Sequence, residues 1–275
     1  MSRIIPILLA SFLGLAPLKS ISPPNHSIDF LKKIILIDAG HGGKENGWEQ
    51  KETKEKTLTL KYAKKLEEKL KKQGFIVIQT RNDDYSLNPN STDLNKDNKY
   101  TISDEIIKRT DKIKNNNPNY IISIHFNANK QSKKQNGTEI YFFGIKDEKE
   151  LTDKRKNIRY NYNNAKIFSE KQKNLALNMQ KHFKKNNLES EVVAADLTFL
   201  QETQEHNSIL LELGYMTNKK DLEYITSEKG KEELTELISD YFRENENFMK
   251  YSPQIDSSLY KPFTYKQDGT ILNPQ

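Results

Sequence analysis

The chain of 275 residues contains no cysteine. This absence excludes disulfide bridges, thiolate ligands for a metal and a lipid-modified cysteine anchor. Any metal bound by this protein must therefore be held by histidine, aspartate and glutamate side chains.

Features of nucleic-acid-binding proteins are also missing. The sequence has neither a basic helix with interleaved aromatic residues nor a recognised binding motif, so we expect no nucleic acid partner. The formal net charge is only +6 at pH 7. Such a mildly basic protein favours an anionic surface, for example a cell wall, if it is exported.

Long apolar runs are absent except at the N-terminus, where residues 4–18 read IIPILLASFLGLAPL. This run is shorter than the roughly 20 residues of a membrane-spanning helix, and Arg3 precedes it, as in a secretory signal. Lys19 and Ser20 make a poor cleavage site, so residues 1–20 are interpreted as a signal peptide or an uncleaved N-terminal anchor. Without them the net charge is +4. We expect export to the periplasm or cell envelope.

From Lys33 onward, short β-rich runs alternate with amphipathic segments, which is typical of an α/β sheet. We predict a single three-layer α/β domain over residues 33–246, with a mixed, mostly parallel sheet of about six strands and helices on both faces. The expected strands cover 33–39, 75–80, 120–126, 138–143, 191–195 and 208–214. The expected helices cover about 54–73, 102–116, 165–185, 219–225 and 231–242.

Three further segments fall outside this alternation. Residues 86–100 are polar and Asn-rich and are predicted to form a surface loop. Residues 144–164 are strongly charged and longer than the connection requires. Residues 247–275 have no helical period and are predicted to form a C-terminal tail.

Three chemically reactive side chains lie near the ends of predicted buried strands. His41 follows the strand that closes at Asp38 and stands among glycines, His125 ends YIISIHF, and Glu212 lies in SILLELG. The sequence GGKE does not form a phosphate loop, because no Ser or Thr follows Lys44 and the required earlier glycine is absent. Strand ends in one sheet can converge at a single point.

Two histidines and one carboxylate are the ligand set of a catalytic zinc site that keeps an open fourth position. The alternatives remain open at this level: His41 can be a solvated turn histidine, and Glu212 can form a buried salt bridge.

Four motifs occur in a fixed order over about 200 residues. They are ILIDAGHGGKENG, followed by the EKTLTLKYA helix and its FIVIQTRNDD strand, then IISIHFNA with GTEIYFF, and finally ILLELGYMTNKKDLEYI. On these motifs the chain from Lys33 to about Phe242 resembles the zinc-dependent N-acetylmuramoyl-L-alanine amidases of the Amidase_3 type. These exported enzymes cut the stem peptide from the muramic acid of peptidoglycan.

The resemblance implies that His41, Glu55 and His125 are ligands of Zn²⁺ and that Glu212 is the catalytic glutamate. This corrects the first ligand set, since Glu55 takes the place of Glu212. If Thr53 is the N-cap, Glu55 is the second helical residue, where the helix N-terminus stabilises an anionic side chain. The neighbouring glutamates, including Glu45, are interpreted mainly as solvated surface charges.

Supporting roles also follow from the resemblance. Asn127 is expected to support its strand end by hydrogen bonding, and Arg81 and Arg109 are expected to form structural ion pairs. The sequence departs from the family at Asn207, which stands where a proline is usual. The nearby His206 is interpreted as a loop residue. The residues that bind substrate are not assigned.

The implied reaction is hydrolysis, by zinc-activated water, of the amide between N-acetylmuramic acid and L-alanine of the stem peptide. The alternatives are a non-catalytic wall-binding module on the same fold and a zinc peptidase acting on stem peptides. Expected partners are peptidoglycan or muropeptides and an envelope activator protein, and the chain is expected to be a monomer. In some relatives an inserted helix covers the zinc, but we expect residues 144–164 to be a solvated loop at the cleft edge.

Overall fold

The computed structural model describes residues 33–94, 96, 98–144 and 162–245, together with β9 (Thr264–Tyr265) and β10 (Ile271–Leu272), which pair antiparallel. The predicted signal peptide or anchor at residues 1–20 lies outside the described residues. So do most of the 144–164 connection and the 247–275 tail apart from its two short strands.

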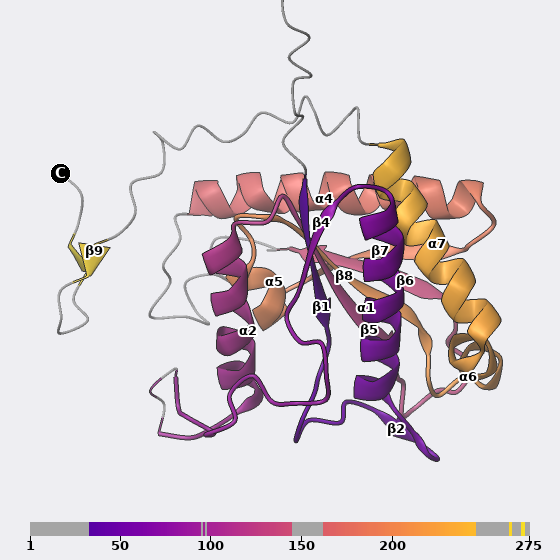
Figure 1. The fold of residues 1–275 in the computed structure, drawn as a ribbon, viewed down its shortest axis with the longest axis horizontal. Coiled ribbons are helices and arrows are strands. Elements are labelled where there is room, and N and C mark those ends of the chain that lie inside the picture. The colour runs from indigo at the N-terminus through magenta and orange to yellow at the C-terminus, as the bar shows by residue number, and fades with distance from the viewer. Residues whose placement is uncertain are drawn as a thin grey trace, which may run out of the picture. The chain divides into compact units, whose positions relative to one another are not determined.

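A six-stranded sheet forms the centre of the domain (Figure 1). Its order is β4-β1-β5-β8-β6-β7, and all neighbouring strands are parallel except β6 and β8, which are antiparallel. The strands are β1 (Ile34–Ala39), β4 (Ile76–Gln79), β5 (Tyr120–Asn127), β6 (Thr138–Phe143), β7 (Ser190–Ala195) and β8 (Asn207–Tyr215). Each lies within one residue of the predicted strand, so the mixed, mostly parallel sheet is confirmed.

Helices cover both faces of this sheet, as predicted, and Figure 1 shows α1 and α2 on opposite sides of it. One hydrophobic core joins the sheet to side chains of α1 (Glu55–Lys72), α4 (Tyr162–Lys185), α6 (Lys219–Thr226) and α7 (Glu228–Glu244). The core on the other face contains side chains of α2 (Ile102–Asn116) and α5 (Thr198–Glu202). The helix α5 was not predicted, because five residues are too few to show a helical period.

The apolar stripe of α1 illustrates how the sequence pattern produces this packing. Leu58, Ala63, Leu66 and Leu70 recur at helical spacing, and all four are at most 5% exposed. Gly74 follows the helix with φ 93°, a left-handed conformation that glycine adopts without steric cost. The stripe and the stop signal therefore define α1 as the sequence predicted.

The start of α1 differs from the prediction. The N-cap is Lys54, with no side-chain capping hydrogen bond, and Glu55 is the first helical residue. Thr53 does not cap the helix because it pairs with Gln50 between the short strands β2 (Glu49–Gln50) and β3 (Thr53–Lys54). Glu55 nevertheless lies in the first turn, where the helix dipole favours a carboxylate.

The topology brings the predicted site residues to one edge of the sheet. The neighbours of β1 are β4 on one side and β5 on the other, so the order of the strands switches at β1. The carboxyl ends of β1, β5 and β8 lie at the same edge, where open α/β sheets place their ligand sites. Because β6 is antiparallel to β8, its amino end also lies at this edge.

Candidate metal centre and active site

The glycines around His41 make room for side chains of the site. A Cβ atom added to Gly40 would lie 2.3–2.7 Å from three ring atoms of His125, and one added to Gly47 would lie 2.5 Å from Oε2 of Glu55. His41 itself adopts φ 61°, a left-handed conformation that is uncommon for a residue with a Cβ. The glycine-rich turn therefore allows two histidine rings and a carboxylate to approach one another closely.

Within the described part of the chain, His41, Glu55 and His125 form a group whose donor atoms lie within 4.8 Å of one another. Oε1 of Glu55 lies 2.8 Å from Nε2 of His41 and 3.1 Å from Nδ1 of His125. The two imidazole rings meet edge to face, with centroids 4.8 Å apart. The group contains Glu55 and not Glu212, the carboxylate that the strand ends alone had suggested as the third member.

Glu55 is buried and held by the backbone as well as by the histidines. Its Oε2 accepts a hydrogen bond from the Trp48 amide at 2.8 Å, and its Oε1 accepts one from the Phe126 amide at 3.2 Å. Burial alone would raise the pKa of Glu55, but the hydrogen bonds and charges of His125 and His41 outweigh it and hold the pKa well below its usual range. The carboxylate is therefore ionised and fixed in orientation.

Glu45 orients His41 from the other side of the ring. Its Oε1 lies 2.6 Å from Nδ1 of His41, so Nδ1 carries a proton toward Glu45 and Nε2 faces Glu55. Burial lowers the pKa of His41, but hydrogen bonds to Glu45 and Glu55 outweigh it and raise the pKa to about 9. Glu45 is thus an exception to the interpretation of most of the neighbouring glutamates as solvated charges, and its only local signal was its position four residues after His41.

Two arginines hold the His41 turn through its backbone. Arg109 Nη1 donates to Oδ1 of Asp38 at 2.7 Å and to the Ala39 carbonyl at 2.8 Å, and Nη2 donates to the His41 carbonyl. The predicted ion pair of Arg109 is thus confirmed, with Asp38 as its partner.

Arg81 behaves differently from the prediction. It donates to the Ala39, Gly40 and Lys56 carbonyls at 2.8–3.0 Å, and so links the His41 turn to the first turn of α1. Among the described residues it forms no ion pair within 4.0 Å. Backbone carbonyls, which leave no signal in a sequence, take the place of the expected carboxylate.

Asp38 lies directly beneath this turn and is 1% exposed. Thr80 and Ser123 each donate a hydroxyl hydrogen bond to it at 2.7 Å, in addition to Arg109. Burial alone would raise the pKa of Asp38, but the charge of Arg109 and these hydrogen bonds lower it to about 2. A buried, ionised carboxylate therefore anchors the end of β1.

Glu212 lies on β8, next to the strand that carries His125, and so stands beside the group formed by His41, Glu55 and His125. Its Cα is paired with that of His125 in the ladder between β5 and β8. Its Oε2 is buried and has no hydrogen-bond partner among the described residues. Burial, together with the negative charge of Glu55 and to a lesser degree of Glu139, raises the pKa of Glu212 well above its ordinary value, although His41 opposes this shift.

Asn127 makes the kind of hydrogen bond predicted for it. Its Nδ2 donates to Oε2 of Glu139 at 2.7 Å, and its Oδ1 accepts from the amide of Ala128.

The predicted surface loop at 86–100 is more firmly held than expected, because Asn88 is 3% exposed and the Glu105 carboxylate accepts hydrogen bonds from the amides of Leu87 and Asn88.

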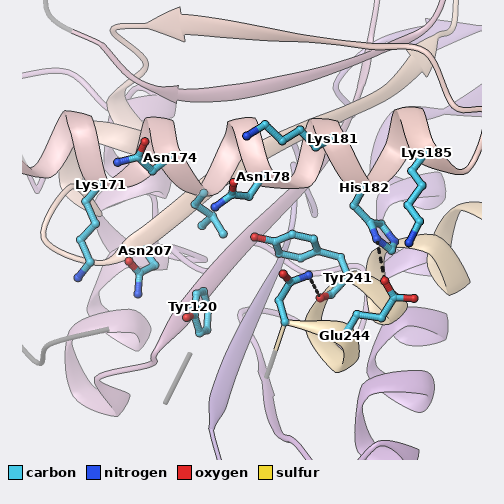
Figure 2. A pocket seen from close by; sticks show the side chains of 12 residues that line it. Tyr120, Lys171, Asn174, Asn178, Lys181, His182, Lys185, Asn207, Tyr241 and Glu244 are labelled. Atoms are coloured by element: carbon cyan, nitrogen blue, oxygen red, sulfur yellow. Dashed lines mark hydrogen bonds and ion pairs between the residues drawn. The ribbon is translucent and has the colours of Figure 1, made fainter. Parts of the chain in front are cut away.

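A groove of about 540 Å³ lies at the opposite edge of the sheet, between α4, the end of α7 and the first residues of β5 and β8 (Figure 2). It contains Tyr120 and Asn207, which lie five residues before His125 and Glu212 on their respective strands. At about 3.3 Å per residue this separation is roughly 16 Å. Asn207, at the position where a proline was expected, donates to the Asn119 carbonyl. Both Asn207 and the adjoining His206 are thus remote from the candidate metal ligands His41, Glu55 and His125.

No helix in the described ranges of the chain combines the length and the apolar composition needed to cross a membrane.

Comparison with known proteins identifies the family. The profile of the N-acetylmuramoyl-L-alanine amidases (Amidase_3) matches residues 35–242. The germination-specific N-acetylmuramoyl-L-alanine amidase of Bacillus subtilis is 33% identical over 128 residues, which cover 46% of this chain and 52% of that protein. The chain spans only 52% and 57% of the length of two curated relatives that it matches.

Solved structures share the fold. The catalytic domain of CwlV, an N-acetylmuramoyl-L-alanine amidase from Bacillus (Paenibacillus) polymyxa var. colistinus, is 26% identical with a TM-score of 0.56, covering 78% of this chain and 98% of that chain. The CwlD amidase of Clostridioides difficile, solved in complex with the GerS lipoprotein, is 26% identical with a TM-score of 0.57, covering 79% of this chain and 100% of that chain. Since the profile match covers more than half of the chain and includes the whole candidate site, the protein belongs to the N-acetylmuramoyl-L-alanine amidase family.

Proposed function

We propose that this protein is a zinc-dependent amidase of the cell envelope that hydrolyses the bond between N-acetylmuramic acid and L-alanine in peptidoglycan. One observation carries the proposal: two histidines and a buried glutamate converge beside a second carboxylate, Glu212, whose buried oxygen has no partner among the described residues. Membership of the family supports the choice of substrate.

His41, Glu55 and His125 would hold the zinc ion. The donor set fits, because two imidazoles and one carboxylate are the ligands of catalytic zinc sites with one open position. The orientation also fits, because Glu45 fixes the proton of His41 on Nδ1 and leaves Nε2 facing Glu55. When bound, zinc supplies Lewis-acid chemistry, polarising the scissile carbonyl and lowering the pKa of the attacking water.

Glu212 would carry the proton in this reaction. Its carboxylate would accept a proton from the attacking water and then donate it to the nitrogen of the leaving L-alanine. A pKa raised by burial and by neighbouring carboxylates suits a group that must both accept and release a proton. The route requires no covalent intermediate with the enzyme.

The two alternative functions are less well supported by the site. A wall-binding module has no use for a carboxylate such as Glu212, whose Oε2 is costly to bury without a hydrogen-bond partner among the described residues. A zinc peptidase would use the same donor set, so its products separate it from an amidase.

We further propose that residues 1–20 direct export, that the working form is a monomer, and that an envelope protein modulates its activity. The CwlD amidase was solved in complex with a lipoprotein, which supports the last point.

The decisive experiment is mass spectrometry of defined muropeptides after incubation with the purified protein, with and without a chelator. We expect release of a peptide with a free L-alanine N-terminus, and loss of this product when zinc is removed. Glu212→Gln should retain zinc and fold while losing about 10²–10⁴-fold in turnover. Cleavage within the stem peptide would instead identify a peptidase, and normal turnover by Glu212→Gln would contradict its role.

Zinc content tests the ligands separately from the chemistry. We expect about one zinc ion per chain in the wild type and its loss in His41→Ala and His125→Ala. Glu55→Ala should weaken zinc binding far more than Glu52→Ala, a matched control in the turn between β2 and β3. Full zinc occupancy in both histidine variants would refute the assignment.

A further inference from the structure

Four ionisable side chains form one row across the sheet at the edge that carries the site. Glu191 of β7 is paired with Glu139 of β6, Glu139 with Glu212 of β8, and Glu212 with His125 of β5. Residues paired in this way project from the same face of a sheet. Glu139 therefore stands beside Glu212 on the side away from His125.

Glu139 is an acceptor for three hydrogen-bond donors from three strands. Asn127 Nδ2 and the Tyr141 hydroxyl each donate to its Oε2 at 2.7 Å, and the Tyr215 hydroxyl donates to its Oε1 at 2.7 Å. Hydrogen bonds to an ionised carboxylate are shorter and stronger than those between neutral groups. These three bonds thus fix the donors relative to one another.

Two of these donors stand just beyond the functional residues. Asn127 is two residues after His125, and Tyr215 is three residues after Glu212. The ladder between β5 and β8 changes register between His125 and Asn127, so its regular backbone pairing is interrupted there. A backbone hydrogen bond from Met216 to Asn127 and the two side-chain bonds to Glu139 rejoin the strand ends.

We propose that Glu139 is a positioning residue, which holds the ends of β5 and β8 so that Glu212 keeps a fixed place relative to the metal ligands. This inference rests on the proposed function in one respect, namely that Glu212 must be placed for chemistry. Glu139 does not itself contact the reacting atoms in this scheme, since its oxygens are occupied by Asn127, Tyr141 and Tyr215. Misplacement of a reacting group by about 1 Å can lower a rate about 100-fold.

Glu139→Gln tests the proposal with almost no change in side-chain volume. The matched control is Glu191→Gln, which removes an exposed carboxylate from the same row one strand farther from Glu212. Tyr215→Phe removes a single donor from the buried side of the cluster. Amide hydrogen exchange of the metal-free proteins, zinc affinity, and kcat and KM on a defined muropeptide are then compared.

We expect exchange at residues 125–129 and 212–216 to become at least about tenfold faster in Glu139→Gln and to stay unchanged in Glu191→Gln. We expect kcat to fall about 10–100-fold, with KM and zinc affinity within about threefold of the wild type. Tyr215→Phe should change exchange and kcat in the same direction by a smaller factor.

Three results would overturn the proposal: unchanged exchange in Glu139→Gln, faster exchange with wild-type kcat, or loss of zinc along with activity. Failure of the proposed function is distinct, because it appears as a wild-type protein that releases no peptide from muropeptides. The exchange comparison needs neither metal nor substrate, so it still decides whether Glu139 holds the two strand ends.

Discussion

Replacing Asp38 with asparagine tests whether the buried ion pair beneath the His41 turn stabilises the domain. Asparagine has nearly the same shape, but it removes the negative charge that faces Arg109 at 2.7 Å. Both side chains are buried, at 1% and 5% exposed. Removing one partner of a buried pair leaves the other charge uncompensated and typically costs roughly 3–5 kcal/mol. We expect the free energy of unfolding at pH 7 to fall by about this amount in Asp38→Asn.

The pKa of Asp38 determines how the difference in unfolding free energy between the wild type and Asp38→Asn depends on pH. The pKa falls from 3.8 to about 2 in the folded protein. At 1.36 kcal/mol per pKa unit, ionisation of this carboxyl contributes about 2 kcal/mol of stability. Because the folded pKa is depressed, this contribution is present above about pH 4 and is lost as the pH falls toward 2. The stability difference between wild type and Asp38→Asn should therefore narrow by about 2 kcal/mol over that window.

Urea unfolding of the metal-free proteins, followed by circular dichroism at pH 7, 5, 3 and 2, measures both effects. Asp84→Asn provides the control, because Asp84 pairs with Lys56 but its side chain is 47% exposed. Solvent screening limits such a pair to about 1 kcal/mol or less. A loss below about 1 kcal/mol in Asp38→Asn at pH 7, or a difference that stays constant down to pH 2, would refute the reasoning.

Two further predictions concern the geometry of the site. Gly40→Ala should displace the His125 ring, whose atoms lie 2.3–2.7 Å from the new Cβ, and should lower zinc affinity severely in a folded protein. The added Cβ of Gly74→Ala meets no atom within 4 Å but the residue must adopt φ 93°, so this control should lower the free energy of unfolding in urea by about 1 kcal/mol and retain zinc. Equal zinc affinity in Gly40→Ala and Gly74→Ala would contradict the steric argument. Glu45→Gln should lower zinc affinity about 10–100-fold in a competitive chelator titration, with the exposed Glu49→Gln as control. Unchanged affinity in Glu45→Gln would show that its contact with His41 does not orient the ligand.

The sequence predicted those parts of the fold that depend on local patterns. The apolar runs located all six strands of the central sheet within one residue, and the stripe of α1 with Gly74 located that helix. It also placed His41 and His125 at strand ends that converge. It did not reveal α5 or the pairing of β2 with β3, since segments of five and two residues carry no period.

The choice of the third donor depended on tertiary structure. Glu212 lies within a buried strand and is the more conspicuous carboxylate in the sequence, whereas Glu55 is one of several glutamates in a polar stretch. Resemblance to a family singled out Glu55, and the fold explains why: the start of α1 lies against the His41 turn, where Oε1 of Glu55 lies 2.8 Å from His41 and 3.1 Å from His125.

The sequence by itself thus determined the six strands of the central sheet, the class of fold and two of the three residues of the candidate metal site, because these follow from hydrophobic periodicity and from residues at strand ends. Only the tertiary structure decided that Glu45 contacts His41, that Arg81 binds carbonyls and that Glu139 joins two strand ends. These contacts form between residues whose proximity depends on sheet order, strand register and loop conformation. Apart from the four-residue spacing of His41 and Glu45, no local pattern indicates them, since the groups involved are carbonyls, hydroxyls and carboxylates that are common throughout the chain.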